Sequence, residues 1–250
     1  MNETLVRLAS GIVYVVLLLF CITFSKESFF ALFGTFLLIA SFEFSKLVNL
    51  NKWLLISIAI AALSLVFIYP HFNNKLENLD YIITLFSVTT LFYLIYNLFL
   101  QKENPKKLDF MYFIGYIILP FIIALKIPFN GINYRPKIFI SIIILIWTND
   151  TFAYLVGKNF GKNKLFPSIS PKKTIEGFVG GMIFTVICGL LLANYYINAN
   201  SPYIWIIIAL IVSVFSTIGD LIESKFKRSA GVKDSGKIMP GHGGILDRLD

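Results

Sequence analysis

Residues 224–250 combine cations, carboxylates and glycines, which is the set of groups that phosphate and a divalent metal require. Lysine and arginine neutralise phosphate oxygens, carboxylates hold magnesium, and glycine lets backbone N–H groups approach an anion closely. The run Pro-Gly-His-Gly-Gly at 240–244 predicts fixed turns, which argues against the alternative of a solvated, disordered tail. The basic members are Lys225, Lys227, Arg228, Lys233, Lys237 and Arg248, and the acidic members are Asp234, Asp247 and Asp250.

The apolar stretch before this segment, residues 203–223, carries a polar stripe. At about 100° per residue, six further polar side chains fall within about 60° of Asp220 on one helix face. A stripe of this kind on an apolar helix must face water or protein rather than lipid. We therefore expect Asp220 to point toward the same site that Asp247 closes. The six side chains are Ser213, Ser216, Thr217, Glu223, Ser224 and Lys227.

A second acid, Asp150, also lies inside an apolar stretch, and its spacing places it on one helix face with Tyr154 and Gly157. A charge at this depth costs roughly 2.5–3.5 kcal/mol on insertion scales, so such a residue usually faces a cavity and has a partner. The alternative is an acid that pairs with a lysine only for packing.

The segment 157–177 lies between two apolar stretches and carries five lysines. Its run Ser-Pro-Lys-Lys-Thr at 170–174 precedes a helical pattern, so Ser170 or Thr174 is expected to cap the next helix. The N–H groups at a helix start attract phosphate, and Lys172 and Lys173 would add positive charge. The alternative is an ordinary lysine-rich cytoplasmic loop.

The terminal segment reads Ser-x-apolar-Lys-Arg, four residues, Lys-Asp, and after a short spacer Pro-x-His-Gly-Gly-apolar-x-Asp-Arg-apolar-Asp. In this spacing it resembles the signature of the phosphatidate cytidylyltransferases, also called CDP-diglyceride synthases. Met239 departs from it, because the family usually has Leu, Ile or Phe there. The runs at 170–177 and 219–224 look like further elements of the family, so the resemblance covers roughly residues 147–250.

The resemblance implies transfer of a cytidylyl group from CTP to phosphatidic acid by a homodimer that sits among membrane lipids. It implies Mg²⁺, with another divalent or a monovalent ion as the alternative. Asp220 and Asp247 are the predicted metal ligands, with Asp234 and Asp250 as further candidates. His242 is predicted to be either an acid or ligand, or a structural hydrogen-bonding residue. The predicted phosphate-binding residues are Lys227, Arg228, Lys233, Arg248, Ser170, Lys172, Lys173, Thr174, Ser224, His242, Gly243 and Gly244.

Hydrophobic residues make up 57% of the 250 positions and charged residues only 14%, whereas soluble domains average about 25% charged. The chain is therefore predicted to be an all-α, polytopic membrane protein. The fifth apolar span is short and broken by Pro120. Relatives continue past the signature, so we also expect a further C-terminal helix after Asp250. The eight predicted spans lie near 8–24, 29–47, 53–69, 81–100, 110–126, 137–156, 176–196 and 203–223.

Basic residues indicate the orientation, because 17 of the 22 fall on one side if the N-terminus is inside. This predicts a protein of the cell (inner) membrane whose N-terminus and charged segments are cytoplasmic. The net charge of +8 suits an anionic leaflet and anionic substrates, so we expect no nucleic-acid partner. Residues 1–136 are predicted to be scaffold and dimer surface, and 137–250 to be catalytic. Glu43, three residues before Lys46, is expected to snorkel at a span end.

Two alternative functions stay open at this point. One is cytidylyl transfer to another membrane lipid phosphate, such as that of an isoprenoid ether lipid. The other, of a different class, is an ion-coupled transporter, which would place its polar residues midway across two repeated halves. Here they gather toward the cytoplasmic ends of one half, which favours the transferase.

Overall fold

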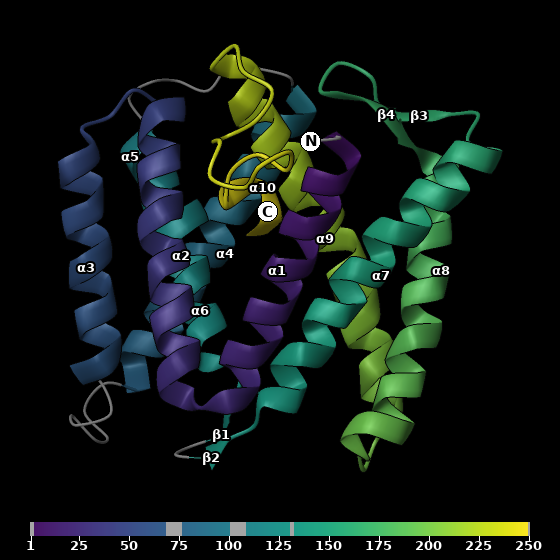
Figure 1. Ribbon diagram of the computed structural model, residues 1–250, viewed down its shortest axis with the longest axis horizontal. Coiled ribbons are helices and arrows are strands. Elements are labelled where there is room, and N and C mark those ends of the chain that lie inside the picture. The colour runs from purple at the N-terminus through teal and green to yellow at the C-terminus, as the bar shows by residue number, and fades with distance from the viewer. Residues whose placement is uncertain (1–2, 69–76, 101–108, 131–132, 250) are drawn as a thin grey trace. The chain divides into compact units, whose positions relative to one another are not determined.

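The computed structural model describes residues 3–68, 77–100, 109–130 and 133–249. Helices dominate them, and each predicted span coincides with a helix or with consecutive helical segments (Figure 1). The segments are α1 (Glu3–Phe24), α2 (Lys26–Leu47), α3 (Lys52–Ile68), α4 (Glu77–Leu100), α5 (Asp109–Tyr112), the π-helical turn η3 (Phe113–Ile118), α6 (Leu119–Lys126), α7 (Pro136–Phe160), α8 (Ile175–Leu191), the π-helical turn η4 (Leu192–Ile197), α9 (Tyr203–Ser229) and α10 (Leu246–Leu249).

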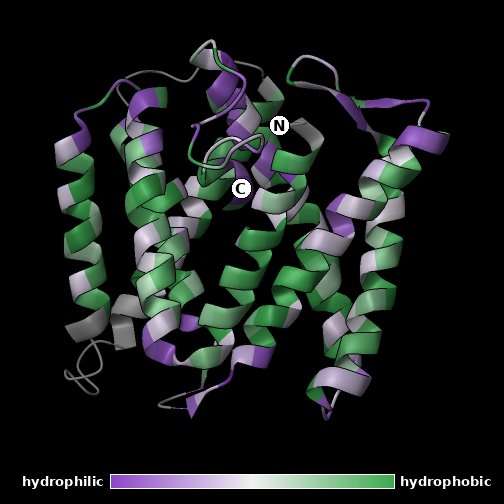
Figure 2. Cartoon of the chain, viewed as in Figure 1, coloured by the Kyte–Doolittle hydropathy of each residue, from purple (hydrophilic) through white to green (hydrophobic). Residues whose placement is uncertain are grey.

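The all-α, polytopic prediction is confirmed. Among the described residues, seven helical spans are long and apolar enough to cross a membrane, and α3 adds a shorter apolar helix. Figure 2 shows the reason, since the helices are hydrophobic through their middle turns and hydrophilic residues collect toward their ends. Only short strands accompany them in this part of the chain, namely β1 (Phe129–Asn130) with β2 (Asn133–Tyr134), and β3 (Lys164–Phe166) with β4 (Ser170–Thr174).

The fifth predicted span is helical throughout, although Pro120 lies within it. Proline has no backbone N–H, and its ring clashes with the carbonyl four residues earlier. The chain accommodates this in the wider turn η3, where the Leu119 N–H donates to the Ile114 carbonyl, five residues back. The span is therefore continuous from Asp109 to Lys126.

The chain forms two compact units, and each is described by itself. Unit 1 contains residues 1–127 and 225–250, and unit 2 contains residues 128–224, so the boundary falls inside α9. The predicted division into scaffold and catalytic halves at residues 136 and 137 concerns function and stays a prediction.

In unit 1, the end of α9 is fixed by aromatic packing. The Phe226 ring lies 5.3 Å from that of Phe44 on α2 and 5.6 Å from that of Tyr112 on α5, both in edge-on geometry. All three rings are buried. Helix α9 ends at Ser229 rather than at the predicted residue 223, so Lys227 and Arg228 lie on a helix.

In unit 2, α7 and α8 pack closely because glycines line their contact. A Cβ on Gly180 would come within 2.6 Å of the Val156 side chain, and one on Gly177 within 2.6 Å of the Ala153 carbonyl. Small residues let two helix backbones approach in this way. The core at the other end of the unit contains Leu145, Ala193, Trp205 and Ala209.

Candidate functional site

In unit 2, Asp220 on α9 forms an ion pair with Lys173 on β4 and accepts a hydrogen bond from the Ser224 hydroxyl at 3.3 Å. The Asp220 and Lys173 side chains are 39% and 27% exposed. Three predicted site residues therefore meet here, and the carboxylate is open to solvent.

Lys173 is positioned by a β-hairpin, which was not predicted for the segment 157–177. Strand β4 pairs with β3, and the hairpin leads directly into α8. Thr174 caps α8, since its Oγ1 accepts from the Gly177 N–H at 3.1 Å, which confirms one of the two predicted caps. Glu176 in the first turn of α8 accepts from the backbone N–H groups of Lys162 at 3.0 Å and Asn163 at 3.1 Å. The hairpin is thus fastened at both ends.

Most of the polar stripe of α9 is buried in protein, in line with the expectation that it faces protein or water: Ser213 is fully buried and Thr217 is 8% exposed, whereas Asp220 is open to solvent. Asn149 on α7 meets it, donating from Nδ2 to the Ser216 hydroxyl at 3.0 Å. The buried polar side chain on this turn of α7 is therefore Asn149, 1% exposed, whereas Asp150 is exposed. The spacing of Asp150 placed that acid on a helix face but did not indicate that its neighbour Asn149 is the residue that contacts α9.

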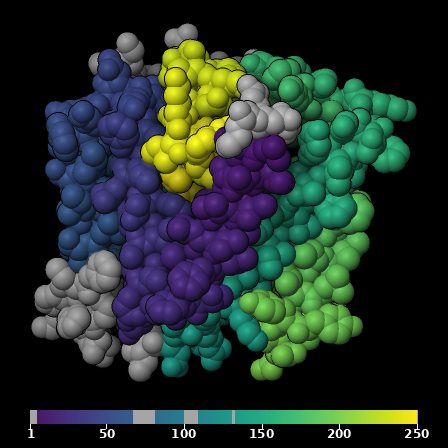
Figure 3. Space-filling model, viewed as in Figure 1, coloured from purple at the N-terminus to yellow at the C-terminus, as the bar shows by residue number. Residues whose placement is uncertain are grey.

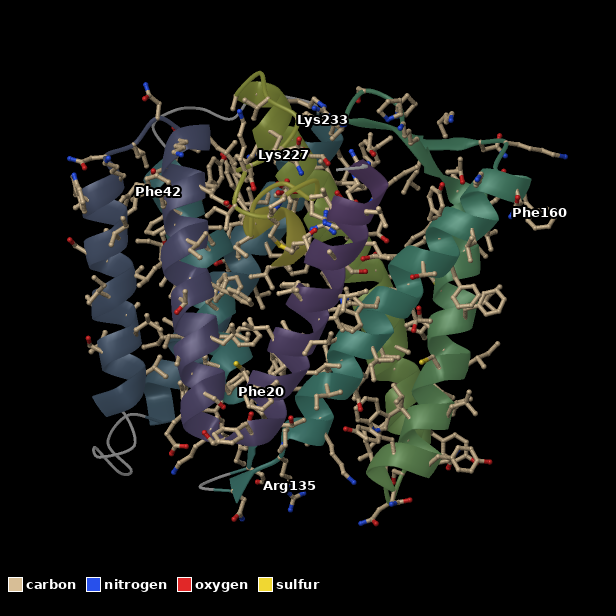
Figure 4. The ribbon with its side chains drawn as sticks, viewed as in Figure 1. Phe20, Phe42, Arg135, Phe160, Lys227 and Lys233 are labelled. Atoms are coloured by element: carbon tan, nitrogen blue, oxygen red, sulfur yellow. The ribbon has the colours of Figure 1, made fainter. Side chains whose placement is uncertain are left out.

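In unit 1, Asp247 organises the terminal segment 224–250. Figure 4 labels two of its lysines, Lys227 and Lys233. Oδ1 of Asp247 accepts from Lys227 Nζ at 2.7 Å. Its Oδ2 accepts from the Gly244 N–H at 2.7 Å and from the N–H and hydroxyl of Ser235, each at 2.9 Å. The Asp247 and Lys227 side chains are only 7% and 11% exposed. Asp247 thus holds both ends of the loop that runs from Ser235 to Gly244.

Glu43 of α2 is a second buried carboxylate beneath this loop, and the expectation that it snorkels is wrong. It is 1% exposed and accepts from the Leu246 N–H at 2.9 Å, the Ile245 N–H at 3.2 Å and the Ser235 hydroxyl at 3.2 Å. Lys46 instead lies over the Phe42 ring, 4.1 Å from its centroid.

Glycines make room for both carboxylates. A Cβ on Gly244 would overlap the Glu43 carboxylate, and one on Gly243 would overlap Oδ2 of Asp247. Gly243 also has a φ of +91°, in the left-handed region that glycine adopts readily. The turn predicted for residues 240–244 is thus packed against the carboxylates of Glu43 and Asp247. The predicted phosphate-binding role of Gly243 and Gly244 stays a prediction.

His242 lies against α1. Its Nδ1 lies 2.8 Å from the Ser10 hydroxyl oxygen, and the Ser10 O–H group donates to the Pro240 carbonyl at 2.9 Å. The predicted structural hydrogen-bonding role of His242 is therefore present in the structure. Burial, then the charges of Arg248 and Arg7, lower the pKa of His242 below its ordinary 6.5.

This lowered pKa predicts how stability depends on pH. The folded protein favours neutral His242, so the stabilisation is complete above pH 6.5 and is lost as the pH falls from there toward the folded-state pKa. We expect the wild-type Tm to fall more than that of His242→Gln between about pH 7.5 and about pH 5.5, measured by thermal unfolding in one detergent. Parallel curves for the two proteins would contradict the assignment.

The other predicted residues are spread over the polar surfaces of the two units. Arg228 donates to the Val232 carbonyl at 3.0 Å, and Arg248 to the His242 carbonyl at 3.1 Å. Lys172, Lys233 and Asp234 are exposed, and Ser170 lies on β4. Asp250 falls outside the described residues. Within the described part of the chain, no three or more His, Cys, Asp or Glu side chains gather as a metal-binding group.

Residues 5–250 match the model of the cytidylyltransferase family. The chain belongs to the cytidylyltransferase family. Among curated relatives, the phosphatidate cytidylyltransferase of Staphylococcus aureus strain COL is 46% identical over 139 residues, which is 55% of this chain and 51% of the relative. Those of Staphylococcus saprophyticus and Staphylococcus epidermidis are 44% and 39% identical over 137 residues, with the same coverage.

The aligned part thus spans about half the length of these curated relatives. The family match, by contrast, includes α1 and α2 as well as the terminal segment. The contacts of Ser10 and Glu43 with that segment therefore lie inside the cytidylyltransferase family match.

Proposed function

We propose that this protein transfers a cytidylyl group from CTP to the phosphate of phosphatidic acid. The products are CDP-diacylglycerol and pyrophosphate. The observation that carries the proposal is the occurrence of two carboxylate–lysine pairs, Asp220 with Lys173 and Asp247 with Lys227, in a member of the cytidylyltransferase family. Names of relatives that match half of their length support the choice of acceptor.

This reaction requires the negative charges of its two substrates to be neutralised, and it does not require a strong base. An oxygen of the lipid phosphate attacks the α-phosphorus of CTP and forms a new P–O bond. The bond from that phosphorus to the bridging oxygen breaks, and pyrophosphate leaves with the electron pair. The attacking phosphate is already ionised near neutral pH, and both reactants are anions, so positioned cations are the main requirement.

Lys173 and Lys227 are suited to this task because each is held in place by a carboxylate. Lys173 is partly exposed and can turn toward an entering phosphate, whereas Lys227 is nearly buried and supplies a fixed charge. The exposed Lys172, Arg228, Lys233 and Arg248 are proposed to bind the outer phosphates.

The same two carboxylates are proposed as magnesium ligands, because they offer the hard oxygen donors that this ion prefers. In each pair, the carboxylate already holds one positive charge, that of the lysine ammonium, so it would also attract a metal ion. Asp220 is the more open of the two, at 39% exposure. Magnesium, when bound, would neutralise phosphate oxygens and favour the departure of pyrophosphate.

Pyrophosphate release from CTP tests the proposed activity. Purified protein in phosphatidylcholine micelles should release pyrophosphate only when both magnesium and phosphatidic acid are present. Phosphatidylcholine alone is the control, because it lacks a free phosphate monoester. Release with an isoprenoid ether-lipid phosphate but not with phosphatidic acid would reassign the acceptor, and no release with either would contradict the proposal. Light scattering of the same sample tests the homodimer implied by the family.

The location proposed for this chemistry is the cytoplasmic face of the cell membrane, based on the distribution of basic residues. In a background without Cys21 and Cys188, cysteines replacing Lys164 and Lys233 should resist an impermeant thiol reagent in intact cells. A cysteine replacing Arg135 should react. All three side chains are exposed, so burial does not confound the comparison. Labelling of the first two from outside would reverse the topology.

A further inference from the structure

An apolar groove runs along one face of α1 and ends at polar groups. It has a volume of about 570 Å³. Its lining positions recur at intervals of four residues, which places them on a single helix face. Gly11 forms a notch in this face, and His242 closes the groove at the terminal segment, which lies against α1 in Figure 3. The aliphatic lining is Leu8, Ile12, Val15 and Val16.

The polar end of the groove is positively charged. Arg7 lines it and is exposed, and among the side chains that the structure describes no carboxylate forms an ion pair with it. A Cβ on Gly241 would lie 2.5 Å from Cγ of Arg7, so the arginine packs on the turn that carries His242. Arg248 donates to the His242 carbonyl at 3.1 Å, so a second guanidinium group lies at this end of the groove. In agreement with this, the charges of Arg248 and Arg7 both lower the pKa of His242.

A cationic end joined to an aliphatic strip matches an amphiphile with an anionic head. From Arg7 to Val16 the helix rises about 14 Å, close to half of the roughly 30 Å hydrocarbon thickness of a bilayer. Only 11% of the α1 span is buried within the protein, so the groove is accessible to lipid. A soluble nucleotide has no hydrocarbon chain that could pack against the four aliphatic side chains of the groove.

We propose that this groove is the seat of the acceptor lipid. One acyl chain lies along Ile12, Val15 and Val16, and the phosphate monoester meets Arg7 beside His242. The assignment rests on the proposed lipid cytidylylation, and it makes Arg7 and Gly11 determinants of acceptor binding. It gives the first helix a substrate-binding role beyond that of scaffold.

Lipid retention tests this assignment without turnover. Detergent-purified protein is mixed with equal amounts of phosphatidic acid and phosphatidylcholine of identical acyl chains, and the bound lipids are counted by native mass spectrometry. Wild type should retain phosphatidic acid preferentially. Arg7→Gln should lower that preference on the order of tenfold, the size expected for one charge-assisted contact. Gly11→Leu should lower retention of both lipids, because it fills the notch.

Matched controls share the same helical hairpin. Lys26→Gln removes a cation at the other end of α1, and Val13→Leu enlarges an exposed side chain off the groove face. Both should behave like wild type, and the Tm of each variant reports on folding. Unchanged retention in both Arg7→Gln and Gly11→Leu, or no preference in wild type, would overturn the assignment.

Turnover separates this proposal from the proposed function. If the protein is active, Arg7→Gln and Gly11→Leu should raise the KM for phosphatidic acid and leave the KM for CTP unchanged. If wild type releases no pyrophosphate at all, the proposed function fails while the retention experiment still decides what the groove binds.

Discussion

Asp247→Asn is expected to abolish cytidylyl transfer and to destabilise the terminal segment. The substitution leaves the Lys227 ammonium, 11% exposed, without its carboxylate. Breaking a buried ion pair in this way costs about 3–5 kcal/mol. If the asparagine kept its one oxygen as acceptor for the Gly244 N–H, its NH₂ group would face the Lys227 ammonium, which is also a donor. Both effects loosen the loop that Oδ2 of Asp247 holds from Ser235 to Gly244.

Stability and activity can be separated in this experiment. Thermal unfolding and pyrophosphate release are measured for Asp247→Asn and for the double variant Lys227→Gln, Asp247→Asn. The double variant removes the uncompensated charge, so it should regain part of the lost Tm without regaining activity. Asp234→Asn, an exposed acid of the same segment, is the matched control and should change the Tm little. Near wild-type rates in Asp247→Asn would remove this carboxylate from the reaction.

Asp220→Asn should behave differently, because its carboxylate is 39% exposed and its ion pair with Lys173 is open to solvent. Pairs of this kind contribute little to stability. A large loss of turnover with an unchanged Tm is therefore expected for Asp220, against a loss of both for Asp247.

The membrane spans were predictable because each is a local property of the sequence. Twenty apolar residues specify a transmembrane helix with little help from the rest of the chain. Even the span interrupted by Pro120 kept its helical bounds, since a single π-helical turn relieves the clash. The end of α9 was less predictable, because Lys225, Lys227 and Arg228 read as a loop by polarity although they are favourable at a helix C-terminus.

The site was predictable only in part, because its long-range partners leave no local signal. Asp220 and Lys173 were both recognised as charged residues of interest, but nothing in their spacing showed that they form an ion pair. Glu43 was misread because Lys46 lies one helical turn away and offered a local explanation. Its actual partners, the N–H groups of Ile245 and Leu246, are about 200 residues distant and belong to the backbone, where side-chain identity carries no information.

Glu43→Gln is expected to reduce turnover on the order of tenfold to a hundredfold, although Glu43 lies beneath the loop rather than among the proposed substrate contacts. Its carboxylate accepts from the Ile245 and Leu246 N–H groups and from the Ser235 hydroxyl. A glutamine offers only one accepting oxygen to these three donors, and each charge-assisted bond contributes roughly 1.5–3 kcal/mol. The Leu246 N–H group belongs to the first residue of α10, which carries Asp247. A displacement of about 1 Å near a reacting group costs on the order of a hundredfold in rate.

The kinetic pattern distinguishes a positioning role from general destabilisation. Measured well below the Tm of each variant, Glu43→Gln should lower kcat with a smaller change in the KM for CTP. Glu43→Asp keeps the charge on a shorter side chain and should recover part of the rate. Glu27→Gln removes an exposed carboxylate from the same helix and should leave rate and Tm unchanged. Equal kcat in Glu43→Gln and wild type would show that α2 does not position the terminal segment for the reaction.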